Sequence, residues 1–180
     1  ETSSEVISQI ICTARRLTSD LAMPIIAAVL RRDNFANDIH IPLSLWWAIE
    51  HFSDNDRLIL SLFADEDVWR SDWKPANSTL WANLVKRYVT KGDQQSLLAC
   101  AALMKSAPET NRHELNQAFA SAVEGRRLPA LPSQLEAELA KSGGVFSTVL
   151  AIRRGDLAKT RFAIDSLGGD GKVSATDAMK

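Results

Sequence analysis

Helical segments recur along this chain in pairs, and their spacing is the strongest constraint on its fold. Apolar residues follow amphipathic helical spacing, and the first helices of successive pairs are expected to begin near residues 5, 41, 76, 111 and 145. An interval of roughly 35 residues is typical of helix-pair repeats. No segment alternates like a strand, so no strand is predicted. We predict an all-α, HEAT-like α-solenoid of about five antiparallel helix pairs; an irregular α-helical bundle is the alternative.

Residues 41–52 are expected to form the helix around which the others pack. Pro42 suits the first turn, where no N–H donor is needed. One apolar stripe consists of Leu45, Trp46, Ile49 and Phe52. Leu43 and Trp47 are apolar as well but point away from this stripe. A helix that is apolar on more than one face needs neighbours on more than one side, so an inner helix is predicted here.

Helix boundaries are indicated by capping residues. Gly92 followed by Asp93 predicts the end of one helix and the start of the next. Two pairs of residues resemble capping boxes, namely Asn111 with Glu114 and Ser133 with Glu136. Each of them predicts a helix start. The segment from residue 65 to residue 74 is expected to be a loop or a single turn.

Composition excludes several function classes. The 180 residues are 46% hydrophobic and carry 22 acidic against 21 basic side chains, a net charge of −1. Such a balance gives no general field for nucleic acid, so no nucleic-acid binding is expected. No apolar run approaches the roughly 20 residues that span a bilayer, so membrane insertion is not expected. Cys12 and Cys100 fall in apolar helical patterns that favour buried free thiols. The chain starts at Glu1, and we expect residues 1–180 to be one helical-repeat domain of a longer multidomain protein.

No catalytic, cofactor-binding or metal-binding residue is assigned, and no cofactor is expected in this segment. The histidines at 40, 51 and 113 are far apart and lack the companions of a metal site. The acidic groups at 54–56 and 65–67 are interpreted as solvated or as helix N-terminal carboxylates. Residues 170–177 match half of a calcium-binding loop, but the first half lacks ligand oxygens, so a helix cap is favoured.

Tryptophans and basic doublets are the candidates for an interaction surface. Trp46 and Trp81 have aliphatic neighbours at helical spacing and are expected in the core. Leu80, Leu84, Val85 and Tyr88 are expected on the same face as Trp81, on a helix that follows Pro75. Trp69 and Trp73 fall in the predicted loop and are candidates for a surface contact. Paired basic residues recur near helix ends, at 15–16, 31–32, 86–87, 126–127 and 153–154. They are interpreted mainly as complements to the helix dipole. The candidate surface residues are Trp69, Trp73, Arg126 and Arg127.

Several stretches resemble one family of multidomain proteins. They are IPLSLWWAIE (41–50), LFAD (62–65) with Val68 and Trp69, KRY (86–88), LLACA (97–101) and GRRLPALP (125–132). Over about residues 38–168, they resemble the helical-repeat segment of large bacterial PVC-type proteins described as membrane-bound dehydrogenases. Those proteins join a propeller-like dehydrogenase domain, HEAT-like repeats and a c-type cytochrome domain. The resemblance implies a connecting scaffold in an exported, periplasmic redox protein and carries over no catalytic residue.

The expected function is therefore a non-enzymatic scaffold or protein-interaction module, whose partners are other domains of its parent or a separate protein. Two alternatives are enzymes. The first is a nucleic-acid enzyme of the HEAT-like DNA glycosylase type, with a site made by Trp69, Asp72, Trp73 and the basic doublets. The second is a small all-α enzyme with a site near Glu50 and His51. The Cys-x-x-Cys-His haem motif is absent from the sequence, so electron transfer would belong to other parts of the parent.

Overall fold

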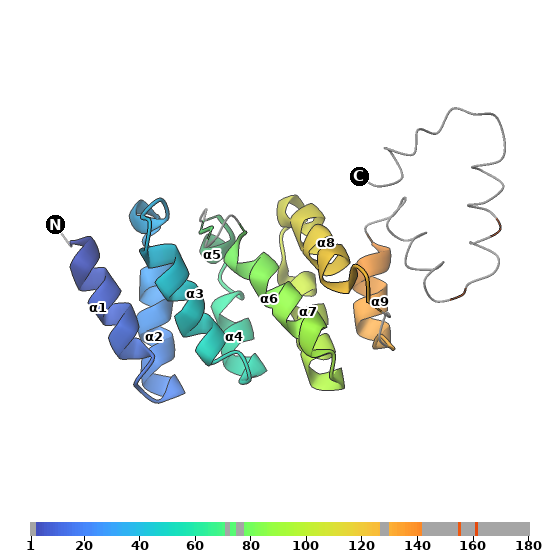
Figure 1. Cartoon of the computed structure of the whole chain (residues 1–180), viewed down its shortest axis with the longest axis horizontal. Coiled ribbons are helices and arrows are strands. Elements are labelled where there is room, and N and C mark those ends of the chain that lie inside the picture. Colours follow the sequence, from blue (N-terminus) through green and yellow to red (C-terminus); the bar gives the residue numbers. More distant parts are fainter. Residues whose placement is uncertain are drawn as a thin grey trace, which may run out of the picture.

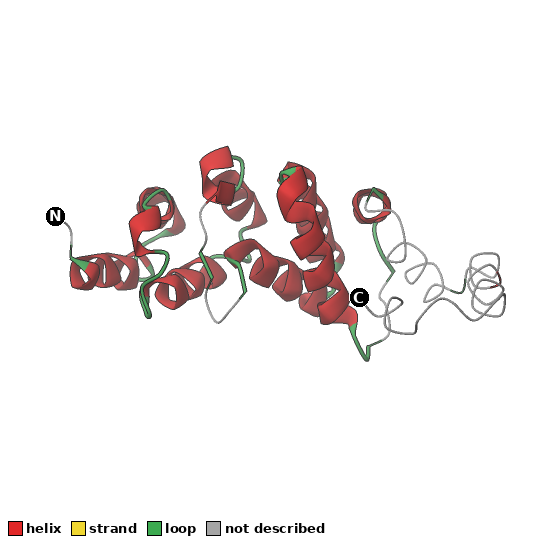
Figure 2. Ribbon diagram, turned by 90° about the horizontal axis from the view of Figure 1, so that it is seen from above, coloured by secondary structure: helices red, strands yellow, loops and turns green. Residues whose placement is uncertain are grey.

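The computed structural model describes residues 3–70, 73–74, 78–126, 130–141, 155 and 161. Over these residues the chain is helical and contains no strand, which confirms the all-α prediction (Figures 1 and 2). The elements are α1 (Ser4–Ala14), α2 (Ser19–Leu30), the 3-10 helix η1 (Asp33–Phe35), α3 (Ile41–His51), α4 (Asp56–Leu62), α5 (Glu66–Arg70), α6 (Leu80–Lys91), α7 (Gln94–Ser106), α8 (Glu109–Val123) and α9 (Ser133–Ala140).

The helices follow one another along the long axis of the molecule in chain order (Figure 1). Helix α1 packs against α3, and α6 packs against α8. On the other side, α2 packs against α4, α4 against α7, and α7 against α9. Contacts of α1 with α2, of α2 with α3, and of α6 with α7 join the two sets. The main contacts therefore connect helices that are close in the sequence.

The predicted starts of the first helices agree well with the structure. Helices α1, α3, α6 and α8 begin at Ser4, Ile41, Leu80 and Glu109, near the expected positions 5, 41, 76 and 111. The fifth expected start, near residue 145, lies outside the described residues. The short helix α5 occupies the segment for which a loop or single turn was expected.

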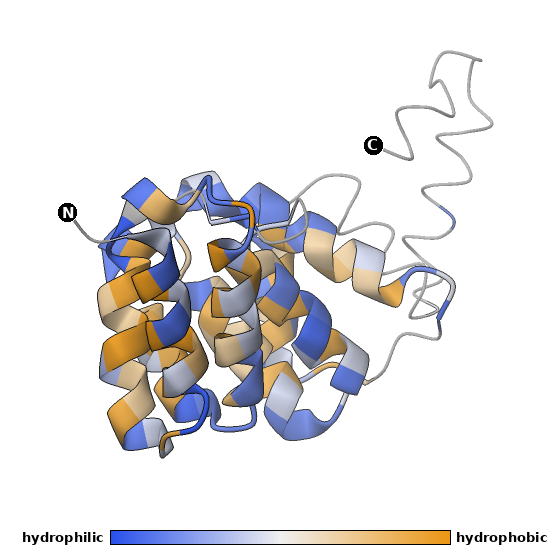
Figure 3. Cartoon of the chain, turned by 60° about the vertical axis from the view of Figure 1, so that its left-hand side comes forward, coloured by the Kyte–Doolittle hydropathy of each residue, from blue (hydrophilic) through white to orange (hydrophobic). Residues whose placement is uncertain are grey.

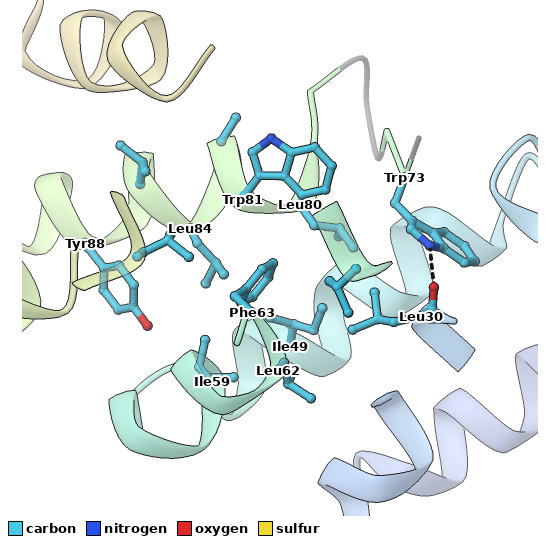
Figure 4. Close-up of a cluster of buried hydrophobic side chains, with 14 of the residues drawn as sticks. Leu30, Ile49, Ile59, Leu62, Phe63, Trp73, Leu80, Trp81, Leu84 and Tyr88 are labelled. Carbon is cyan, nitrogen blue, oxygen red and sulfur yellow. Dashed lines mark hydrogen bonds between the residues drawn. The ribbon is translucent and has the colours of Figure 1, made fainter. Parts of the chain in front are cut away.

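A connected apolar core runs through the described helices, and Figure 4 shows one cluster of its side chains. Hydrophobic and hydrophilic segments alternate along the helix ribbons in Figure 3. Its largest fully buried side chains include Trp73, Tyr88, Phe63 and Phe119. The apolar face predicted for the helix at 80–91 is buried throughout: Leu80, Trp81, Leu84, Val85 and Tyr88. The amphipathic pattern therefore predicts the inward face of this helix correctly.

Helix α3 is covered less completely than predicted. Leu45 and Ile49 have no exposed surface, so one part of the predicted stripe lies in the core. Trp46 is only partly buried against the core, and Trp47 is 47% exposed. The prediction that this helix has neighbours on both flanks is therefore wrong for the face that carries Trp47. That face borders a groove, described below.

The boundary at Gly92 and Asp93 is confirmed. Gly92 has φ +70° and its N–H donates to the Tyr88 carbonyl at 3.0 Å, which ends α6. The Asp93 carboxylate accepts from the Ser96 N–H at 2.8 Å, which starts α7. This N–H contact is the largest cause that lowers the pKa of Asp93. A helix end and a helix start are thus placed on consecutive residues.

Both predicted capping boxes are wrong. Helices α8 and α9 have Pro108 and Pro132 at their N-caps, and neither start has a side-chain cap. The two proline carbonyls accept from the N–H groups of Asn111 and Glu136, each at 3.0 Å. In both helices a proline, whose ring fixes φ, stands directly before the first helical residue. Each helix therefore begins earlier in the sequence than the capping-box pattern predicts.

Replacing Gly92 by alanine should lower the free energy of unfolding by about 1–2 kcal/mol, because a Cβ disfavours the left-handed backbone. The nearest neighbour of the added Cβ would be the Val89 carbonyl oxygen at 3.6 Å, an ordinary contact, so the loss would be conformational. Urea unfolding of the variant measures this loss. Gly92→Asn is the matched control, since asparagine tolerates this conformation better and should lose less. If the wild type and Gly92→Ala were equally stable, the left-handed backbone at Gly92 would not be needed to end α6.

The two cysteines differ in their surroundings. Cys100 on α7 is buried, and its burial raises the pKa of its thiol to about 12. Cys12 is exposed on α1, so the prediction of a buried thiol is wrong there. Cys12 follows Ile11, which faces the core, and successive helical residues are turned by about 100°, so its side chain points away from the buried face made by Ile7, Ile11 and Ala14.

Candidate functional site

Trp69 and Trp73, the expected surface tryptophans, belong to the core. Trp69 is 4% exposed and its indole N–H donates to the Phe63 carbonyl at 2.9 Å. Trp73 has no exposed surface and donates to the Leu30 carbonyl at 3.1 Å (Figure 4). An indole with its N–H satisfied is stable in an apolar interior. This burial corrects the expectation that the two residues form an interaction surface.

The basic residues proposed with them are separate from this core. Arg126 is exposed after the end of α8, and Arg127 lies outside the described residues, as do Asp72 and the doublet at 153–154. The exposed Arg31 pairs with Asp65 at 2.9 Å. The structure therefore does not bring Trp69 and Trp73 together with Arg126 on one surface.

The tryptophans that do reach the surface are on α3, and they border a groove of about 730 Å³ between α3 and α6. We call it the α3–α6 groove. Its lining is Leu43, Trp46, Trp47, Glu50, Asp54, Asn83, Lys86, Arg87, Thr90 and Lys91. The first five come from α3 and the turn after it, and the others come from α6. The groove is thus aromatic and aliphatic near the start of α3 and charged near its end.

Both bordering helices start at well-defined caps. Before α3, the Asp38 carboxylate accepts from the N–H groups of His40 at 2.8 Å and Ile41 at 3.1 Å. These contacts, that of His40 first, lower the pKa of Asp38. Before α6, the Thr79 hydroxyl oxygen accepts from the Ala82 N–H at 3.3 Å. The starting points of α3 and α6 are therefore fixed by local polar contacts.

Ion pairs join the two sides of the groove at its charged end. Arg87 contacts Glu50 at 3.3 Å and Asp54 at 3.8 Å. Lys91 contacts Asp54 at 3.0 Å and Asp93 at 3.6 Å. The hydrogen bond from Lys91 is the largest cause that lowers the pKa of Asp54, and it likewise raises the pKa of Lys91. Both side chains stay charged at neutral pH.

The ion pairs also fix the relative register of α3 and α6. Glu50 with Arg87 and Asp54 with Lys91 are both 37 residues apart. Since residue number increases in the same direction along both pairs, α3 and α6 run parallel. With this offset of 37 residues, Asn83 lies opposite Trp46 along the direction of the two helices. Lys86 lies one residue before Arg87, the residue opposite Glu50.

Lys86 differs from the other cations of the groove. Its ammonium group donates to the Ser78 hydroxyl at 3.4 Å. Among the residues that the structure describes, no carboxylate forms an ion pair with it. The groove therefore contains a partly buried lysine that pairs with no described carboxylate, and two partly exposed indoles line the same groove.

Glu50 and His51 do not share a pocket. Glu50 lines the α3–α6 groove, whereas His51 is exposed and borders a separate hollow with Thr18 and Asn55. The His51 ring packs edge-on against Phe52, with 4.7 Å between the ring centroids. Successive helical residues point in different directions, so a catalytic pair made of these two side chains is not assembled.

Within the described ranges, no three or more His, Cys, Asp or Glu residues are grouped so that they could hold a metal ion. His40 and His113 are both exposed. In the same part of the chain, no helix is both long enough and apolar enough to span a membrane.

Comparison of the chain with protein-family models, with curated proteins and with solved structures gives no match.

Proposed function

We propose that this chain is a non-enzymatic, HEAT-like helical-repeat scaffold that binds a protein segment in the α3–α6 groove. The groove carries the proposal: two partly exposed tryptophans and a half-buried lysine line one hollow on two parallel helices. Aromatic side chains with exposed surface are the residues that most often anchor protein partners.

The spacing of polar contacts between helices supports the repeat. Arg31 bonds to Asp65, Glu50 to Arg87, and Thr79 to Glu114, at separations of 34, 37 and 35 residues. A repeat of roughly 35 residues places equivalent positions of neighbouring repeats side by side. These contacts have the spacing that a stack of helix pairs requires, and we propose five such pairs for the whole chain.

We further propose, from the sequence resemblance alone, that the scaffold is part of a larger exported redox protein. In this proposal the groove accepts another domain of the same parent or a separate protein. The matching residues carry no catalytic role, so the proposal assigns this segment no chemistry.

Two observations favour a scaffold over the enzymatic alternatives. A nucleic-acid enzyme of the DNA glycosylase type would need Trp69 and Trp73 at the surface, but both are buried. A site at Glu50 and His51 would need both in one pocket, but they line different hollows.

Selection from a random peptide library tests the proposed binding function. Peptides enriched on the wild-type chain should bind Trp47→Ala at least about tenfold more weakly, a change of roughly 1.4 kcal/mol. Leu21→Ala is the matched control, because Leu21 is an exposed apolar residue on α2, at 60% exposure, outside the groove. The proposal fails if no peptide is enriched, or if the enriched peptides bind Trp47→Ala as well as wild type.

A further inference from the structure

We propose that the partner segment is an extended peptide that presents a carboxylate to Lys86 and a large apolar side chain to Trp46 and Trp47. This inference rests on the proposed binding function and specifies the ligand. It follows from two features of the groove: no carboxylate among the described residues pairs with the Lys86 ammonium group, and the two indoles have exposed surface.

Charge complementarity selects the acidic residue. The charged groups of the groove are the cations Lys86, Arg87 and Lys91 and the carboxylates of Glu50 and Asp54. Arg87 and Lys91 already contact those carboxylates, so Lys86 supplies the remaining positive charge. A carboxylate of the partner placed beside this ammonium group would form an ion pair that the described residues do not supply.

The same balance favours a peptide over nucleic acid. Glu50 and Asp54 lie in the groove itself and would repel a continuous phosphate backbone. Nucleic acid draws its sequence-independent affinity from several neutralised phosphates, whereas this groove offers one uncompensated cation. A single carboxylate next to an apolar side chain matches the lining better.

The parallel register sets the spacing of the two ligand groups. With residue 50 level with residue 87, Lys86 lies about two to three helical residues beyond Trp46 and Trp47, a rise of roughly 3–5 Å. An extended peptide advances about 3.3 Å per residue. The acidic residue is therefore expected one or two positions from the apolar residue.

The probes are labelled nine-residue peptides that carry Phe at the centre and Glu, Gln or Lys one or two positions away, measured by fluorescence anisotropy at two salt concentrations. The Glu peptides should bind most tightly, and Lys86→Glu should weaken them by about tenfold or more and favour the Lys peptides. Lys86→Gln should weaken the Glu peptides without that reversal. Lys105→Glu, an exposed lysine on α7 outside the groove, should leave affinity unchanged. A thermal melt of each variant verifies folding.

The outcomes separate the two proposals. Binding that is lost in Trp47→Ala but is equal for Glu, Gln and Lys peptides would overturn the acidic ligand and keep the groove as a binding site. Binding that is insensitive to both Trp47→Ala and Lys86→Glu would overturn both. A labelled DNA duplex that binds more tightly than the Glu peptides, and loses affinity in Lys86→Glu, would replace the peptide by nucleic acid.

Discussion

Replacing Trp73 by alanine should lower the free energy of unfolding by about 3–5 kcal/mol, as large truncations in protein cores do. The side chain has no exposed surface and lies among buried residues that include Leu30 and Leu80 (Figure 4). Alanine would leave a cavity and remove the donor to the Leu30 carbonyl. Chemical denaturation monitored by circular dichroism measures the loss.

Trp47→Ala is the matched control for this experiment. Trp47 is 47% exposed and borders the groove, so its removal should cost less than about 1 kcal/mol. The two variants delete the same side chain from different surroundings, which makes their difference a direct measure of burial. Similar small losses in both would mean that Trp73 does not belong to the core.

Glu114→Ala should lower the free energy of unfolding by roughly 2–4 kcal/mol, since it removes the acceptor of two donors at once. The Glu114 carboxylate on α8 accepts from the Thr79 hydroxyl at 2.8 Å and from the Trp81 indole N–H at 3.0 Å. Thr79 is 2% exposed and Trp81 is 3% exposed, so water has little access to the orphaned donors. Thermal and urea unfolding measure the loss.

Two further variants sharpen this test. Glu114→Gln keeps one carbonyl oxygen as an acceptor and should lose about half as much as alanine. Glu109→Ala removes a carboxylate from the first turn of the same helix, where Glu109 is 92% exposed and pairs with Arg112. It should cost less than about 0.5 kcal/mol. A Glu114→Ala variant as stable as Glu109→Ala would show that the bridge between α6 and α8 contributes little.

Local patterns were enough to predict most of the helices. The apolar face of α6 and the boundary at Gly92 and Asp93 depend on residues within one or two helical turns, and both predictions are confirmed. Glu114 shows where such patterns stop being sufficient. Its spacing from Asn111 resembles a capping box, but its partners Thr79 and Trp81 are more than 30 residues away in the sequence. No local pattern distinguishes a glutamate that caps its own helix from a glutamate that binds side chains of a distant segment.

The tryptophans show the same limit for the candidate site. Trp69 and Trp73 were expected at the surface because their segment looked like a loop, and Trp46 was expected in the core because its neighbours are apolar. Trp69 and Trp73 are buried, whereas Trp46 is only partly buried, because burial depends on which elements pack against each segment. The adjacent indoles of Trp46 and Trp47 were the available signal, because two successive helical residues cannot both face one core. That no described carboxylate pairs with Lys86 depends on the register of α3 and α6, which the sequence does not reveal.

The serial packing of the helices has a mechanical consequence. Helices α1 and α9 lie at opposite ends of the described helices, so tension applied between them passes through each interface in turn (Figure 1). Between α3 and α6, ion pairs span the groove, while the packing of α4 against α7 holds the same two parts of the molecule together. We expect tension along the molecule to load these ion pairs together with the contacts between α4 and α7. Under the proposed function, a segment seated in the α3–α6 groove would therefore bind with an affinity that depends on the spacing of these two helices.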